Sequence, residues 1–226
     1  MRALGVVFGG PPGGITGLED RARAVAACWR RGATLDLVIG AETRARAHDL
    51  EAVWRSGVDD EVILLESPAR DQRPGWRRWR GRHEGPRQAG ALPSILGPFD
   101  PTVPRHQVAK AMHDRRYDAV WCADPVAMAY YGKVRRDLPV VLDVPAPLDP
   151  TDETRRVDEP GAWHRFEQAV AASAHLVTVP DDAARERLGV PGALVLDPRS
   201  ADDTSAFHEA VADVCRWSAA FRGMHG

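Results

Sequence analysis

The chain has 226 residues, of which 44% are hydrophobic and 27% are charged, and this balance is sufficient to bury a full core. We expect one globular domain over residues 1–226. The formal net charge of −2 argues against a broad electrostatic surface for nucleic acid or for an anionic membrane.

No apolar run reaches the roughly 18 residues that a membrane span requires. The N-terminus, Met1 to Val7, leads directly into strand-like sequence and does not resemble a signal peptide. The cysteines are odd in number, widely separated and set among apolar residues, at Cys28, Cys122 and Cys215. This pattern favours reduced core thiols over a metal site. We therefore expect a cytoplasmic protein with no metal, no cofactor and no membrane span.

Short continuous apolar runs, typical of strands buried on both faces, recur along the chain. They cover residues 3–8, 35–39, 62–65, 119–122, 140–144, 176–179 and 193–196. Helix-like stretches separate most of them, at 16–31, 43–56, 104–115, 125–136, 160–173 and 181–188. The alternation predicts an α/β fold: a single Rossmann-like three-layer domain with a mostly parallel, doubly wound sheet of about seven strands.

A glycine-rich elbow, residues 6–15, joins the first strand to the first helix. In a Rossmann-like domain such an elbow places unpaired backbone N–H groups and the positive end of a helix dipole beside a crevice. We predict that it binds a phosphate or a sugar hydroxyl through Gly9, Gly10, Gly13 and Gly14. The spacing gives no Gly-x-Gly-x-x-Gly fingerprint, and no Walker lysine follows. The alternative is that these glycines only allow a tight turn.

The first and last helices are amphipathic. In the first, charged residues alternate with apolar ones, and we expect Arg21 either to face water or to reach a phosphate at the edge of the crevice. Gly32 is expected to end this helix. A long closing helix is predicted over 202–221, packed back onto the sheet. This segment carries, at mixed helical spacing, Phe207, Val211, Val214, Cys215, Trp217, Ser218 and Phe221.

A long connection over residues 66–102 is rich in Pro, Gly, Arg and Trp. Connections of this length in a compact domain are usually lids, binding loops or disordered segments. Arg77 and Arg78 are candidate ligand-binding residues that could clamp a phosphorylated ligand or an acidic partner, with neighbouring tryptophans stacking on a ring. The alternative is a solvated surface segment whose tryptophans pack on the core.

A second unusual connection, residues 145–160, follows the strand that ends near Asp143. Open parallel sheets bind ligands at the carboxyl ends of their strands. Asp143 is therefore our candidate for general-base catalysis, and Asp149 is a candidate ligand for sugar hydroxyls. Ordinary loop solvation and helix capping are the alternative explanation for both acids.

Several segments together carry a family resemblance. They are the Gly-Gly loop and first helix at 11–32, the next strand at 34–40, the run Tyr-Asp-Ala-Val-Trp-Cys-Ala-Asp-Pro at 117–125, the run at 135–143 and the helix and strand at 167–180. In these the chain resembles the N-terminal domain of GT-B glycosyltransferases with a family 4-like N-terminal domain, over roughly residues 3–198. The resemblance implies ligand-binding roles for Gly13 and Gly14, and less directly for Asp124 and Asp143.

Members of that family place two Rossmann-like domains face to face, the first mainly holding the acceptor and the second the nucleotide-sugar. This chain has sequence for the first domain alone, because Asp197 to Ser200 leads directly into the closing helix. The donor-side basic residues and paired glutamates of the family have no counterpart. Glycosyl transfer requires neutralisation of the diphosphate leaving group, which half a cleft rarely supplies.

Three functional hypotheses follow. The leading one is the acceptor-side half of a glycosyltransferase, binding a sugar or small-molecule acceptor and working with a separate donor-binding subunit or with a second copy of itself. The second is a non-catalytic binding or scaffold protein derived from such an enzyme, which an exposed aromatic patch would favour. The third is a stand-alone enzyme for a small phosphorylated or glycosylated metabolite, using His164, His175 or Asp143 for proton transfer.

Overall fold

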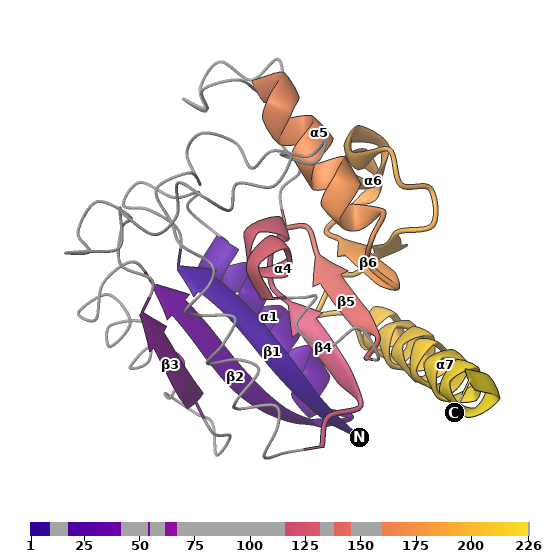
Figure 1. Cartoon of the computed structure of the whole chain (residues 1–226). Helices are drawn as coiled ribbons and strands as arrows, with labels where there is room; N and C mark the ends of the chain where they lie inside the picture. The colour runs from indigo at the N-terminus through magenta and orange to yellow at the C-terminus, as the bar shows by residue number, and fades with distance from the viewer. Residues whose placement is uncertain are drawn as a thin grey trace, which may run out of the picture.

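The computed structural model describes residues 1–9, 18–41, 54, 62–66, 116–131, 138–145 and 160–225. Strands and helices alternate along these residues (Figure 1). In chain order the elements are β1 (Arg2–Gly9), α1 (Leu18–Arg30), β2 (Thr34–Ala41), β3 (Val62–Glu66), β4 (Ala119–Cys122), α4 (Pro125–Tyr131), β5 (Val140–Asp143), α5 (Pro160–Ala171), β6 (Leu176–Val179), α6 (Asp182–Leu188), β7 (Leu194–Val195) and α7 (Ala201–His225).

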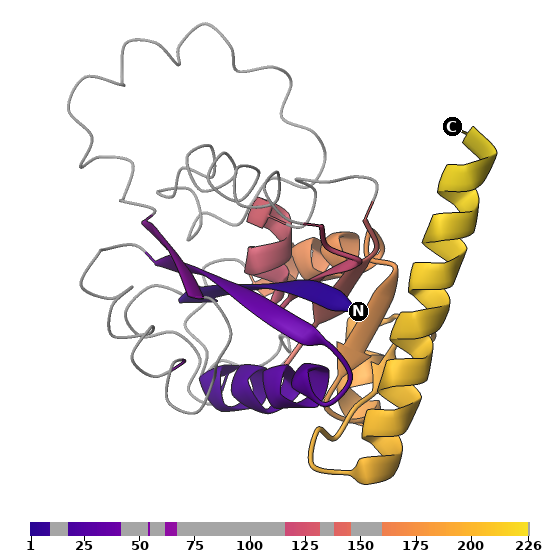
Figure 2. The same ribbon diagram turned by 90° about the horizontal axis from the view of Figure 1, so that it is seen from below.

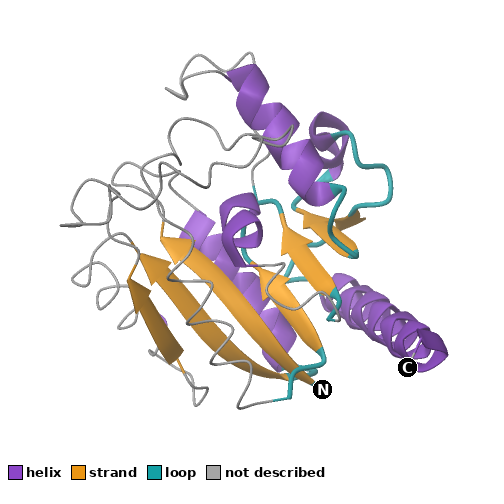
Figure 3. Cartoon of the chain, in the orientation of Figure 1, coloured by secondary structure: helices purple, strands orange, loops and turns teal. Residues whose placement is uncertain are grey.

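The strands form one sheet in the order β3-β2-β1-β4-β5-β6-β7. Every strand pairing in the described residues is parallel, so the carboxyl ends of the strands meet at one edge (Figure 3). This confirms the predicted parallel, doubly wound α/β sheet. The predicted helices at 43–56, except Trp54, and at 104–115 lie outside the described residues.

Each face of the sheet is covered by its own set of helices (Figure 2). Along β1, Ala3 and Val7 pack with α1 and α7, whereas Leu4 and Val6 pack with α4, α5 and α6. The side-chain period of two along a strand sends successive residues to opposite faces. Because both faces are covered, the central strands are apolar throughout, which explains the continuous runs in the sequence.

The centre of the sheet requires a glycine at position 5. A Cβ atom there would lie 2.6 Å from Leu37 Cδ2 and 2.8 Å from Trp121 Cε3, both shorter than ordinary contacts. Trp121 on β4 is fully buried and pairs in register with Gly5. The missing side chain on β1 therefore makes room for the indole of its neighbour.

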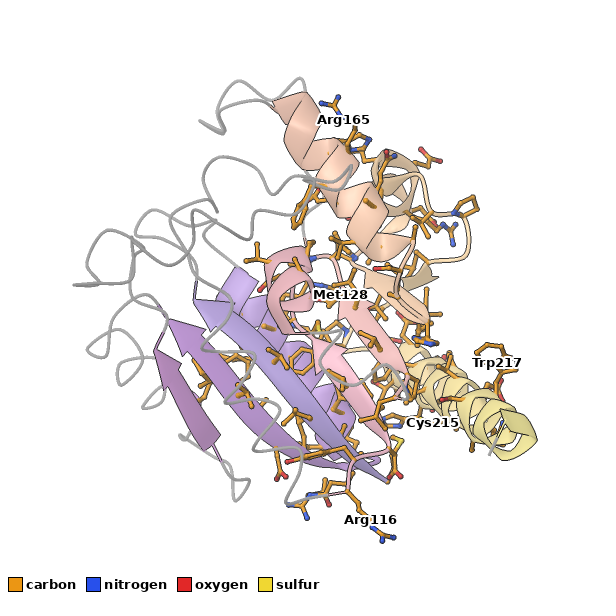
Figure 4. The ribbon with its side chains drawn as sticks, in the orientation of Figure 1. Arg116, Met128, Arg165, Cys215 and Trp217 are labelled. Carbon is orange, nitrogen blue, oxygen red and sulfur yellow. The ribbon has the colours of Figure 1, made fainter. Side chains whose placement is uncertain are left out.

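The predicted closing helix is confirmed and extends from Ala201 to His225. Its first half packs on α1, where the rings of Trp29 and Phe207 meet edge to face at 5.2 Å between centroids. The side chain of Trp217, on the second half of the helix, is 62% exposed (Figure 4). None of the helices in the described ranges, α7 included, combines the length and apolar character needed to cross a membrane.

A buried carboxylate lies at the amino edge of the sheet and connects neighbouring elements there. Asp36 on β2 is 2% exposed, and its Oδ2 accepts hydrogen bonds from Arg2 Nη2 at 2.8 Å and from the Tyr117 hydroxyl at 2.9 Å. The guanidinium also lies over the Tyr117 ring, 5.8 Å from its centroid. These contacts connect the starts of β1 and β2 to Tyr117, two positions before β4.

Candidate functional site

The order of strands reverses direction between β1 and β4. From the central β1 the chain proceeds outward to β2 and β3, then returns to β4 on the other side of β1. At such a switch point the connections leave neighbouring strands in opposite directions, and open parallel sheets bind ligands in the resulting crevice. Gly9 ends β1 there, and Asp124 follows the end of β4. Two residues predicted to bind ligand therefore flank the switch point.

Asp124 is half-buried and caps helix α4. Its Oδ1 accepts a hydrogen bond from the backbone N–H of Ala127 at 2.7 Å, and Pro125 occupies the first helical position. An aspartate cap followed by proline is a strong helix-start signal. The same arrangement recurs after β6, where Asp181 Oδ1 accepts from the Ala184 N–H at 2.7 Å. Asp124 thus has a capping role, and its ligand-binding role stays a prediction.

Asp143, at the end of β5, is completely buried on the face covered by α1 and α7. Both of its oxygens are engaged. Arg21 donates to it through Nη2 to Oδ1 at 2.8 Å and through Nε to Oδ2 at 3.0 Å, and the Thr178 hydroxyl donates to Oδ1 at 2.7 Å. Burial raises the pKa of the Asp143 carboxyl, while the guanidinium and the hydroxyl oppose that rise. The carboxylate is held as an anchor between elements.

The structure corrects the water-facing position expected for Arg21. Its side chain is 13% exposed and is bound to Asp143, and its Nη1 donates to the backbone oxygen of Leu196 at 3.1 Å. A cation in the first turn of a helix opposes the helix dipole, so this arginine is stabilised by its tertiary partners. A signal existed in the sequence: Arg21 stands four residues before Val25 and seven before Cys28, both of which are buried.

Of the other residues predicted from the sequence, His175 is described by the structure and several lie outside the described residues. The side chain of His175 has a structural role. Its Nδ1 accepts a hydrogen bond from the backbone N–H of Val140 at 3.1 Å. Within the described ranges, no group of three or more His, Cys, Asp or Glu side chains is arranged to hold a metal ion. The predicted ligand-binding residues Gly10, Gly13, Gly14, Arg77, Arg78 and Asp149 lie outside the described residues.

Sequence reasoning placed Gly9, Asp124 and Asp143 at strand ends and missed the partners of Asp143. Thr178 and the Leu196 carbonyl carry no motif, and Thr178 reads as one more residue of an apolar strand. Only the strand order β5-β6-β7 brings their positions together.

No protein-family model matches the chain, and no curated protein sequence matches it significantly. Among solved structures, it is similar to Anabaena HepE in complex with UDP, at 18% identity and a TM-score of 0.49, over 85% of this chain and 41% of that chain. It is also similar to UDP-N-acetylglucosamine 2-epimerase from Rickettsia bellii, at 16% identity and a TM-score of 0.47, over 85% and 42%. It is similar to MnaA of S. aureus with UDP as well, at 14% identity and a TM-score of 0.49, over 86% of this chain and 44% of that chain.

The chain therefore spans less than half the length of these three structures. At these identities and TM-scores the similarity identifies no family for the chain.

Proposed function

We propose that this chain is the acceptor-side half of a glycosyltransferase and that it acts with a separate donor-binding subunit or with a second copy of itself. The observation that carries the proposal is the switch point between β1 and β4, with Gly9 and Asp124 at its two sides. The sugar-transfer part of the proposal rests on the distributed sequence resemblance to GT-B acceptor domains.

The chemistry of this crevice suits a polyhydroxylated ligand. A glycine at the end of β1 allows backbone to approach a ligand closely, because no side chain stands between them. A carboxylate at the end of β4 can accept hydrogen bonds from sugar hydroxyls, which are good donors. We assign the acceptor sugar to this position, with Gly10, Gly13 and Gly14 as further proposed contacts.

Asp143 has a different place in the proposal. Its carboxylate binds Arg21 and Thr178 and is 0% exposed, so contact with a ligand would require the packing around it to open. A transfer that retains configuration at the anomeric carbon requires no general base from this half. The catalytic role of Asp143 stays a prediction, and the anchoring role agrees with its contacts.

The same contacts favour a second candidate, a non-catalytic binding protein derived from a glycosyltransferase. In that case the chain would hold a sugar or regulate a partner without transferring anything.

Two measurements on the natural complex separate the candidates. Native mass spectrometry of the protein purified from its source cells gives the subunits, and the same preparation is assayed with radiolabelled UDP-glucose, UDP-N-acetylglucosamine and GDP-mannose. Transfer of label by a complex that contains this chain supports the half-transferase. Binding of a sugar without transfer by any complex supports the non-catalytic candidate. A preparation that neither binds nor transfers any of them contradicts both.

A matched pair of variants tests whether Asp124 contributes to the crevice. Asp124→Ala and Asp181→Ala each remove a helix cap with the same 2.7 Å hydrogen bond, and each should cost about 1 kcal/mol of unfolding free energy. Only Asp124→Ala should weaken sugar binding, because Asp181 lies beyond β6, away from the switch point. Equal binding by both variants would contradict the assignment of Asp124.

A further inference from the structure

Arg21 links helix α1 to three strand ends at the carboxyl edge of the sheet. Its guanidinium binds both oxygens of Asp143 on β5 and the carbonyl of Leu196 after β7, and the same carboxylate accepts from Thr178 on β6. These partners lie 122 and 175 residues from Arg21 in the sequence. The bonds are almost fully removed from water, because Asp143 is 0% and Arg21 is 13% exposed.

The geometry of these bonds restricts movement of α1. A planar guanidinium that donates in a fork to a carboxylate, and through its remaining nitrogen to a carbonyl, fixes both its distance and its orientation. Arg21 belongs to the first turn of α1, which begins at Leu18. The backbone N–H groups of a first turn have no partner within the helix, and such groups can bind an anion or a hydroxyl oxygen.

We infer that Arg21 is a positioning residue for the crevice: through Asp143 it fixes the first turn of α1 relative to the carboxyl ends of β5 and β6. The inference rests on the proposed function, because the crevice is the site assigned there. A lysine at position 21 keeps the charge and loses the fork, so it separates positioning from simple charge compensation.

The amino edge supplies a matched control. Arg2 also binds a buried aspartate, through Nε at 2.9 Å and Nη2 at 2.8 Å to Asp36 Oδ2, but it lies at the opposite edge of the sheet. Arg2→Lys should therefore perturb an arginine–aspartate pair of the same chemistry without moving the first turn of α1.

The test combines amide hydrogen exchange with titration of the protein by glucose, the probe for the acceptor sugar that is assigned to the crevice. In Arg21→Lys, amides 22–25 should exchange about tenfold faster, while amides 27–30, which lie next to the contact with α7, change little. The dissociation constant for glucose should rise about tenfold in Arg21→Lys and remain within about twofold in Arg2→Lys.

If Arg21→Lys fails to fold, the double variant Arg21→Met with Asp143→Leu removes both charges and serves in its place. Unchanged exchange at amides 22–25, equal acceleration along the whole helix, or faster exchange with unchanged affinity would each overturn the inference. If the wild-type protein binds no glucose, the proposed function fails for that acceptor sugar, and the exchange data alone then decide whether Arg21 fixes the first turn.

Discussion

The two edges of the sheet each hold a buried aspartate bound to an arginine, but the pairs differ in their surroundings. At the carboxyl edge Asp143 is 0% exposed and its partner Arg21 is 13% exposed. At the amino edge Asp36 is 2% exposed, whereas Arg2 is 42% exposed. Water can solvate and screen Arg2 but hardly reaches Arg21. The same two residue types therefore form a partly solvated ion pair at the amino edge and an almost fully buried ion pair at the carboxyl edge.

The pairs also differ in what they join. Arg21 and Asp143 hold α1 against β5, β6 and the segment after β7, on the face covered by α1 and α7. Arg2 and Asp36 join the starts of neighbouring strands, with Tyr117 beside them. The Arg21–Asp143 pair restricts the position of α1 relative to the strands. The Arg2–Asp36 pair joins strands that backbone hydrogen bonds already hold together.

The largest expected effect is at the carboxyl edge. Asp143→Ala leaves a nearly buried guanidinium without its counter-charge, and we expect it to lower the free energy of unfolding by about 3–5 kcal/mol. Urea denaturation measures the loss. The double variant Arg21→Met with Asp143→Leu should recover a large part of it, since both charges are then absent. A loss no greater than that of Asp36→Asn would contradict the difference between the two edges.

The next effect is expected midway between the edges, at Gly5. Gly5→Ala places a methyl group 2.6 Å from Leu37 Cδ2 and 2.8 Å from Trp121 Cε3. Overpacking of this kind typically costs about 1–3 kcal/mol. Thermal unfolding, together with near-ultraviolet circular dichroism of the buried indoles, measures it. Because Gly5 touches neither pair, Gly5→Ala combined with Asp36→Asn should give additive losses; strong coupling would contradict their independence.

A smaller effect is expected for Asp36→Asn at the amino edge. The amide keeps an oxygen that can accept from Tyr117, and water solvates the released Arg2, so the loss should be about 1 kcal/mol. The measurement is urea denaturation at low and at high salt. The ionic part of the wild-type contribution should weaken with salt, because Arg2 is 42% exposed. A loss that is large and independent of salt would show that the Arg2–Asp36 pair is as well shielded from water as the Arg21–Asp143 pair.

The smallest effect concerns pH and again lies at the amino edge. Burial lowers the pKa of His175 below its ordinary value of 6.5, and the neutral ring accepts a hydrogen bond from the Val140 N–H. Because the folded-state pKa is below the unfolded one, this stabilisation is present above about pH 6.5 and is lost as the pH falls through the folded-state pKa. The unfolding free energy should therefore fall on acidification from neutral pH, and by less in His175→Gln. An equal fall in both proteins would contradict this origin.

Much of the fold could be predicted from local pattern. Each strand of the structure coincides with a continuous apolar run to within two residues at either end, and the strand–helix alternation required parallel pairing. The cap at Asp124 was readable as an aspartate before a proline at the end of a strand. The exposure of Trp217 could not be predicted in this way, because an apolar residue in a helix is buried only if something packs on that face.

For the candidate site, too, some features could be predicted from local pattern and others could not. The sequence by itself determined that Gly9, Asp124 and Asp143 stand at the carboxyl ends of strands, since that depends on the order of residues within one element. Only the tertiary structure decided which partners they have. Asp143 meets Arg21 across 122 residues because strand order and helix packing bring them together, and no local period contains that information. The tertiary structure thus adds the bonds from Arg21 and Thr178 to an acid whose catalytic role stays a prediction.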